Sequence, residues 1–340
     1  MGITIKQIAK KSGFGVGTVS RALSDDDVSV KAETRQKILA IAQKYGYVKN
    51  ASAQALASKK SRDIGLVIPA YFKSPFYSDF YIKTIAGGIE QLSGFEKVKG
   101  YKLRILFLRD KNSFSELLQE SQALKLGGLI LTPYCRDFFI QESDIKKLEI
   151  PVVVLSQEID GPNIRSVVLD DFKGGYDGTK FLIALGHRRI GVIRGFYEDI
   201  EERFGGYKQA LNDYGISLRE EYIMKGNALQ DSGYDRTIKL LRLKDKPTAI
   251  FALDDEMAYG ALEAIRTLGL RCPDDISVMG FDGIEISRFT TPALTTVVRP
   301  VEKMGKVAVR LLVDSDMWKK EKVIKVEGEV VARKSCMAIG

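Results

Sequence analysis

The feature that most constrains the fold is a series of short apolar runs that begins after Arg62 and continues through most of the chain. Each run ends in polar or glycine residues, and amphipathic segments with helical spacing lie between most of them. The runs cover residues 63–71, 102–110, 126–134, 150–156, 189–195, 248–254 and 276–282. Continuous apolar strands that alternate with helices are typical of parallel sheets covered on both faces. We therefore predict an α/β body of two doubly wound parallel sheets, with a ligand cleft at the carboxyl ends of their strands.

The N-terminal part of the chain differs from this body in charge. The 340 residues include 52 basic and 44 acidic side chains, which gives a formal net charge of +8. Residues 1–62 contain 12 basic and 4 acidic side chains, so this segment carries the whole excess and the rest is neutral. Because phosphate neutralisation requires local positive charge, this distribution indicates a nucleic-acid partner for the first segment.

Length and composition bound the remaining possibilities. A chain of 340 residues is expected to form two or three domains. No apolar run is long enough to span a membrane, and the first residues lack the apolar core of a signal peptide. The three cysteines, Cys135, Cys272 and Cys336, are scattered and odd in number, so they predict neither a disulfide framework nor a metal cluster. We expect a cytoplasmic protein with no membrane partner, no metal and no cofactor.

The apolar spacing in residues 4–45 predicts three short helices. Thr4 is a plausible N-cap for a helix that ends at Gly13, and a second helix spans 16–24 after the turn at 13–15. A third amphipathic helix, 33–45, closes a small core. This pattern predicts a helix-turn-helix over Thr4–Leu23, whose outward hydroxyl groups suit phosphates and whose Arg21 can reach guanine in the major groove.

The segment that follows, "NASAQALAS" at 50–58, supports two interpretations. Asn50 can cap a short alanine-rich helix that is marginal alone in water and orders on DNA, with Leu56 wedged between base pairs in the minor groove. The alternative is a plain interdomain linker.

These landmarks give the chain a resemblance to the lactose-repressor/galactose-repressor family over essentially its full length. The matching motifs are "TVSR" at 18–21, "TR" at 34–35, "GY" at 46–47 and "N…A..LA" at 50–57. The resemblance implies an all-α helix-turn-helix head and a body with the type I periplasmic-binding-protein-like fold. It places the head at 1–49, a hinge helix and linker at 50–61, and an effector-binding and dimerisation domain at 62–340. The N-subdomain would comprise 62–160 and 292–323, and the C-subdomain 161–291 and 324–340, with crossovers near 160, 291 and 324.

For the head, the resemblance implies that Arg21 and the start of the second helix contact bases, while Thr18, Ser20, Thr34 and Tyr47 hold phosphates. The full set of expected DNA contacts is Thr4, Ile5, Val16, Gly17, Thr18, Ser20, Arg21, Thr34, Tyr47, Asn50, Ala53, Gln54, Leu56 and Ala57. Val16 and Gly17 depart from the family, because these positions usually set operator preference and neither side chain here can donate a hydrogen bond. Base recognition should therefore rest on Arg21, on apolar contacts to thymine methyl groups and on the hinge.

For the body, the resemblance implies an effector site just past the strand ends. Arg203 in "RFGGY" and Asp282 in "MGFD" match effector-contacting positions, and Asp254 stands where Asn or Ser is common. A bidentate arginine that faces carboxylates suits the vicinal hydroxyl groups of a sugar. The expected effector contacts are Tyr71, Phe76, Thr132, Ser156, Arg194, Arg203, Asp254, Asp282 and Arg299.

Two features leave the class of effector open. Ala228 replaces an aromatic wall that relatives often carry, and Arg136, Arg194 and Arg299 add positive charge near the expected cleft. These arginines favour a phosphorylated or acidic sugar, unless they are paired with Glu198, Glu201 or Glu202. The hypothesis is a carbohydrate-type effector, with a neutral sugar slightly favoured.

The predicted function is a ligand-controlled transcriptional regulator, and specifically a repressor. A homodimer would place two heads on a pseudo-palindromic, double-stranded operator, and a small sugar-type effector would alter the angle between the subdomains. Control by a partner protein is an alternative within the same family, and a solute-binding protein is a remote one. An enzyme is not expected, because His187, the only histidine, has no nucleophile motif beside it.

Overall fold

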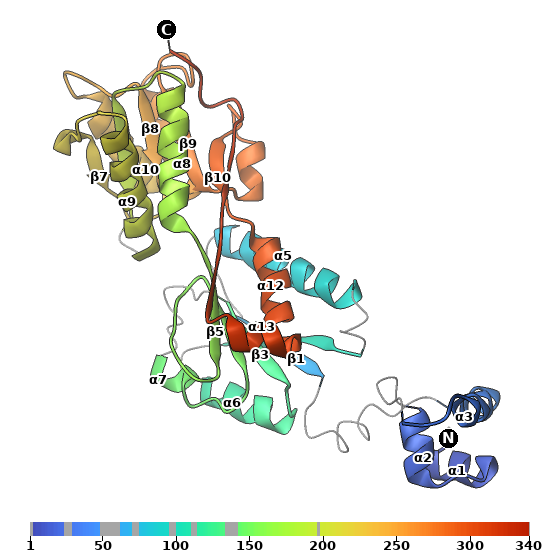
Figure 1. Ribbon diagram of the computed structural model, residues 1–340. Coiled ribbons are helices and arrows are strands. Elements are labelled where there is room, and N and C mark those ends of the chain that lie inside the picture. Colours follow the sequence, from blue (N-terminus) through green and yellow to red (C-terminus); the bar gives the residue numbers. More distant parts are fainter. Residues whose placement is uncertain are drawn as a thin grey trace. The chain divides into compact units, whose positions relative to one another are not determined.

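The computed structural model describes residues 3–23, 29–47, 62–69, 75–94, 100–109, 114–132, 142–195 and 198–339 (Figure 1). The chain divides into two compact units, Met1–Ser61 and Arg62–Gly340, which we call the head and the body.

The head is a bundle of three helices, α1 (Ile5–Ser12), α2 (Val16–Ala22) and α3 (Ala32–Lys44). Thr4 and Gln7 form a capping box at the start of α1, and Gly13 ends that helix in the left-handed region with φ 74°. Ile8, Val19 and Ile38 contribute one fully buried side chain from each helix to the core. The predicted helix-turn-helix is therefore present, with α2 as its second helix.

The first sheet of the body has the strand order β11-β5-β4-β3-β1-β2. Its strands are β1 (Asp63–Pro69), β2 (Lys102–Leu108), β3 (Gly128–Leu131), β4 (Val152–Leu155), β5 (Ile164–Leu169) and β11 (Val323–Val326), and all neighbouring strands are parallel. One apolar core packs α6 (Phe114–Ala123) and α7 (Glu142–Ile145) against one face. A second core packs α5 (Pro75–Ser93) and α12 (Val301–Val313) against the other, beside which lies α13 (Ser315–Lys320).

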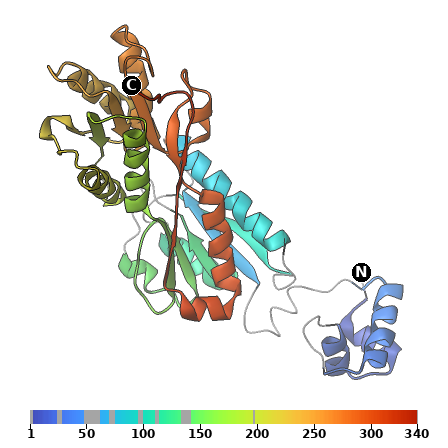
Figure 2. The ribbon, with the colours of Figure 1, turned by 45° about the horizontal axis from the view of Figure 1, so that its top comes forward.

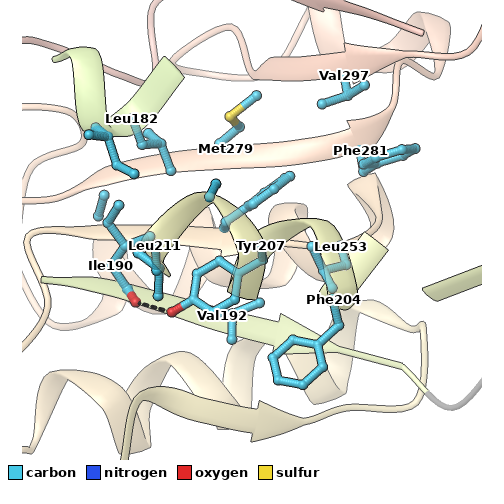
Figure 3. Close-up of a cluster of buried hydrophobic side chains, with 14 of the residues drawn as sticks. Leu182, Ile190, Val192, Phe204, Tyr207, Leu211, Leu253, Met279, Phe281 and Val297 are labelled. Carbon is cyan, nitrogen blue, oxygen red and sulfur yellow. Dashed lines mark hydrogen bonds between the residues drawn. The ribbon is translucent and has the colours of Figure 1, made fainter. Parts of the chain in front are cut away.

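The second sheet has the order β12-β10-β9-β8-β6-β7, and only the edge strand β12 is antiparallel to its neighbour. Its strands are β6 (Ile190–Arg194), β7 (Ile223–Lys225), β8 (Ala249–Ala252), β9 (Ser277–Asp282), β10 (Thr295–Val298) and β12 (Glu329–Val331). Helices α8 (Asp171–Ala184) and α9 (Glu198–Asp213) cover one face through the core drawn in Figure 3. Helices α10 (Gln230–Leu241) and α11 (Asp255–Thr267) cover the other. Both sheets thus have helices on both faces, as predicted.

The positions at which the chain passes between the sheets correct the expected subdomain boundaries. β5 belongs to the first sheet and β10 to the second, while the last two strands, β11 and β12, are divided between them. The three crossovers therefore follow β5, β10 and β11, and each lies later in the chain than the expected positions near 160, 291 and 324 (Figure 2). Arg165 and Ser166 interrupt the apolar run of β5, so the sequence pattern there does not indicate a strand.

Glycines set the spacing of the helices that carry the polar residues of the body. A Cβ on Gly175 of α8 would lie 1.9 Å from the carbonyl oxygen of Arg203 in α9. A Cβ on Gly260 of α11 would lie 1.9 Å from the carbonyl oxygen of Gln230 in α10. Since no side chain can be accommodated at these distances, the backbones of each pair approach closely, and this places Arg203 beside the start of α8.

Candidate nucleic-acid interface and ligand site

The outer face of α2 is exposed and carries short side chains except at Arg21. Val16, Gly17, Ser20 and Arg21 are all exposed, and Thr18 is half-buried. The Nε of Arg21 donates to the carbonyl oxygen of Gly17 at 3.3 Å, so the Arg21 side chain lies along its own helix. A Cβ on Gly17 would meet nothing within 4 Å, so packing within the head does not require glycine there.

The other expected contacts of the head have different surroundings. Thr4 is exposed, and its hydroxyl is engaged with Gln7 in the capping box. Ile5, Thr34 and Tyr47 are half-buried, and Ile5 and Tyr47 pack against the core of the head. Near them, the ammonium of Lys11 lies 4.3 Å from the centre of the exposed Tyr45 ring. The expected hinge contacts, Asn50, Ala53, Gln54, Leu56 and Ala57, lie outside the described residues.

In the body, Arg203 is the centre of a buried network and is only 2% exposed. Its Nε donates to Asp171 Oδ1 at 2.7 Å, and its Nη1 donates to the carbonyl oxygen of Leu253 at 2.6 Å. The same Nη1 lies 3.2 Å from Asp282 Oδ1, and the guanidinium stacks 3.8 Å from the centre of the Phe281 ring. Arg203 thus fixes the ends of β8 and β9 and the start of α8 relative to one another.

Arg299 connects this network to the first sheet. It follows β10, and its Nη1 lies 3.6 Å from Asp282 Oδ1. Its Nη2 donates to the hydroxyl of Ser156, which follows β4 of the first sheet, at 2.9 Å. Its guanidinium also lies 5.7 Å from the centre of the Phe80 ring in α5. The Arg299 side chain therefore bridges the carboxyl ends of the two sheets.

Both partners of Arg299 have unusual backbone conformations. Ser156 has a φ of 63° and Asp282 a φ of 108°, backbone values that residues other than glycine seldom adopt. Strain of this kind occurs mainly at functional sites, where the surrounding structure holds it in place.

Asp254 completes the group, which we call the polar cluster: Asp171, Arg203, Asp254, Asp282 and Arg299. Asp254 is the N-cap of α11, and its Oδ1 accepts from the backbone of Met257 at 2.6 Å. Its Oδ2 is buried and has no hydrogen-bond partner among the described residues. Burial, and then the neighbouring charge of Asp282, raises the pKa of Asp254 to about 7. Asp254 thus has one oxygen used in the fold and one available to a ligand, as an acceptor above about pH 7 where the carboxyl is ionised.

Sequence reasoning missed Asp255, although it lies in the acidic triplet 254–256. This fully buried carboxylate accepts from the hydroxyl of Thr296 at 2.6 Å and from the backbone of Ile284 at 2.9 Å. Burial raises the pKa of Asp255 well above its usual range. Because Ile284 lies two residues after Asp282, Asp255 holds the turn that positions the Asp282 side chain.

Several expected effector residues are not brought into the polar cluster. The hydroxyl of Thr132 donates to the carbonyl oxygen of Val67 at 2.8 Å, within the first sheet. Both carboxylate oxygens of Glu201 accept from Nη1 of Arg194 at 2.5 Å, on the α9 side of the second sheet. Tyr71, Arg136 and the side chains of Phe76 and Glu198 lie outside the described residues.

His187 has a place in the fold away from the cluster. Its side chain is fully buried, with Nδ1 2.9 Å from the Thr248 hydroxyl and Nε2 3.2 Å from the carbonyl oxygen of Met337. Burial lowers the pKa of His187, which favours the neutral ring. The imidazole therefore ties the C-terminal segment to the second sheet.

Two further properties concern the described residues as a whole. None of their helices is long and apolar enough to span a membrane. No group of three or more histidine, cysteine, aspartate and glutamate side chains is arranged to hold a metal ion in that part of the chain.

Comparison with known proteins identifies both units. Residues 4–50 match the family described as bacterial regulatory proteins, lacI family, and residues 179–336 match the periplasmic binding protein-like domain. The chain is 34% identical over 330 residues to the probable HTH-type transcriptional repressor ExuR of Bacillus subtilis (strain 168), and the match covers 95% of each chain. It is 35% identical over 319 residues to catabolite control protein A of Priestia megaterium, with 92% of each chain covered.

A solved structure is similar over nearly the whole chain. The complex of the transcriptional regulator CelR with cellobiose has a TM-score of 0.66 and 27% identity, and the match covers 98% of this chain and 99% of that one. These relatives confirm the predicted family and its fold of a helix-turn-helix head with a two-sheet α/β body. The chain belongs to the lacI family of bacterial regulatory proteins and is a DNA-binding transcriptional regulator.

Proposed function

We propose that this regulator is a repressor whose operator affinity is controlled by a neutral, sugar-type effector bound at the polar cluster. The observation that carries the proposal is the buried, unpartnered Oδ2 of Asp254, which lies in a network that already fixes Arg203 and Asp282. A buried acceptor without a hydrogen bond costs free energy. A ligand whose hydroxyl donates to this acceptor removes that cost and therefore binds with higher affinity and specificity. The cellobiose complex of CelR shows that a relative with this fold binds a sugar.

The charge balance of the cluster supports a neutral ligand over an acidic one. Its two arginines face three carboxyl groups, and each arginine already lies within 3.6 Å of a carboxylate oxygen. Arg194, whose charge would favour an anion, is engaged with Glu201. No surplus positive charge therefore remains in the cluster to offset the desolvation of an anionic effector.

The bond between Arg299 and Ser156 supplies a route for control. It joins the two sheets at their carboxyl ends. A ligand that forms a hydrogen bond with Arg299 or Ser156 in its place would alter how the two sheets are held together. In the proposal, residues 50–61 act as the hinge that transmits this change to the head, because they connect the head and the body in the sequence.

For DNA, we propose that α2 enters the major groove and that Arg21 contacts bases. The exposed Val16 and Gly17 would contribute apolar contact without a side-chain hydrogen bond. A homodimer is proposed because two heads suit a two-fold operator and because the body exposes apolar side chains. On α5 and β2, the exposed fractions are 66% for Ile82 and 61% for Phe107.

Selection of operator sequences with the full chain, followed by gel-shift titration, tests the proposal. We expect tight binding to a palindromic site that weakens with salt, and a neutral sugar from a panel should change the affinity about tenfold or more. In Asp254→Asn, compared with wild type above the pKa of Asp254, this response should be reduced, because the amide supplies only one acceptor oxygen. The exposed Asp235→Asn on α10 is the matched control. Failure to bind any palindrome at low salt, or a response to purines alone, contradicts the proposal.

A further inference from the structure

The second sheet carries a groove that shares no residue with the polar cluster. It lies where β6 and β7 end beside α9, has a volume of about 530 Å³, and is open to solvent on one side. This size falls within the range of pockets that hold small molecules, which is about 300–1,000 Å³. Arg194, Lys208 and Lys225 line it, together with Phe204 and one carboxylate, Glu220. We call it the β7 groove.

Two of its three basic side chains lie against one aromatic ring. The Arg194 guanidinium lies 4.6 Å, and the Lys208 ammonium 4.9 Å, from the centre of the Phe204 ring. Phe204 is only 7% exposed and belongs to the apolar core, at whose margin it lies in Figure 3. Attraction between cations and the face of an aromatic ring therefore orients both side chains before any ligand arrives.

Of the three basic groups, the two lysines retain hydrogen-bonding capacity. Nη1 of Arg194 donates to both carboxylate oxygens of Glu201, so this arginine is already paired. Neither Lys208 nor Lys225 forms an ion pair with a carboxylate in the described part of the chain. An anion can therefore accept from the two lysines while Arg194 keeps its contact with Glu201.

We propose that the β7 groove is a second ligand site, and that it binds a phosphorylated monosaccharide. The phosphate would accept from Lys208 and Lys225, because ammonium groups are common phosphate donors in proteins, and the paired Arg194 would line the groove beside them. The volume exceeds what one phosphate fills, and Glu220 provides an acceptor for sugar hydroxyls. The two sites divide the chemistry, with a neutral effector at the polar cluster and an anionic ligand at the groove.

Calorimetric titration of the full chain with glucose 6-phosphate at low ionic strength tests this proposal, with glucose as the uncharged probe. We expect saturable binding that Lys208→Gln and Lys225→Gln each weaken about tenfold, the loss of one charge-assisted contact. Two controls remove the same charge elsewhere, Lys239→Gln on α10 and Lys6→Gln in the head, and both should bind as wild type does. Inorganic phosphate should compete for the groove but bind more weakly.

Each other result overturns the assignment. Absence of saturable binding shows that the groove is not a site, and loss in Lys6→Gln shows that the basic head holds the anion. Weakening by Asp254→Asn shows that glucose 6-phosphate binds at the polar cluster. Equal affinity for inorganic phosphate excludes a sugar phosphate as the specific occupant.

Discussion

At the scale of single residues, Asp254 combines an observed role in the fold with a proposed role in binding. Its Oδ1 caps α11, a role that stabilises the fold, while the buried Oδ2 is the proposed contact with the effector. The sequence motif predicts Asp254 as an effector contact. Its shifted pKa follows from burial and from the nearness of Asp282, and neither can be read from one sequence.

The raised pKa of Asp254 predicts a pH-dependent stability. The unfolded side chain loses its proton near pH 3.8, whereas the folded one keeps it until about pH 7. Between these values the folded state binds more protons, so the free energy of unfolding falls as the pH rises and levels off above pH 7. From pH 5 to 7 the loss should be on the order of 2 kcal/mol.

Urea denaturation of wild type and Asp254→Asn across this pH range measures the effect. Asparagine keeps the cap but has no proton to lose, so the variant should lack this part of the pH dependence. Asp235→Asn should follow wild type. Parallel curves for wild type and Asp254→Asn would show that the carboxyl is ionised throughout.

For other residues, the sequence motif predicts the position in the chain but not the direction of the side chain. The motif predicts that Arg203 and Asp282 both contact an effector, and the structure places the two side chains 3.2 Å apart. Because Arg203 is also bonded to Asp171 and Leu253, we expect it to position the proposed site more than to contact a ligand. Thr132 follows β3 and Arg194 is the last residue of β6, yet their side chains bond to Val67 and Glu201. The direction of a side chain after a strand depends on the backbone of the turn, which the sequence pattern leaves undetermined.

At the scale of elements, the close contact of α8 with α9 sets the position of Arg203. Gly175→Ala would place a methyl group against the carbonyl oxygen of Arg203, with no flexible group able to move aside. We expect the helices to separate, the bond between Arg203 and Asp171 to lengthen, and the stability to fall by about 1–3 kcal/mol. Sugar binding at the polar cluster should weaken as well.

Gly205→Ala on the same helix pair is the control. Its added methyl group would meet only the ring of Phe172, at 3.3 Å, and that ring is 40% exposed and can shift. Thermal unfolding and sugar titration of both variants measure the difference. Equal effects of the two substitutions would contradict a special role for the contact at Gly175.

The elements themselves are predictable to different degrees. All seven apolar runs of the sequence form strands, and six of these strands are buried along most of their length. The edge strand β2 is mostly exposed, but four apolar residues follow its Arg104 and keep the run recognisable. The pattern does not reveal β5 because Arg165 lies within it, where the guanidinium stacks 4.5 Å from the centre of the Trp318 ring. It does not reveal β7 and β12 because short edge strands with exposed residues lack a strong periodicity.

At the scale of the whole molecule, the proposed dimer gives a further prediction. Ile82 and Ile89 of α5, and Ile105 and Phe107 of β2, are all exposed on one side of the first sheet. Exposed apolar patches on soluble proteins often mark interfaces, so Phe107→Lys should shift a dimer toward the monomer and weaken operator binding. Leu268→Lys, at an exposed apolar position after α11, is the control.

Sedimentation velocity over a range of protein concentrations distinguishes the outcomes. Wild type and Leu268→Lys should sediment as dimers and Phe107→Lys as a mixture that shifts with concentration. An unchanged dimer in Phe107→Lys would place the interface elsewhere on the chain.

The division of the last strands between the two sheets has a consequence for synthesis on the ribosome. β11 completes one edge of the first sheet and β12 one edge of the second, and both come from residues 323–331. Until these residues leave the ribosome, β5 and β10 have no partner along one side, and open strand edges favour pairing with other chains. A nascent body is therefore prone to aggregate until residues 323–331 have emerged, and a product truncated before residue 323 would have one unpaired strand edge in each sheet.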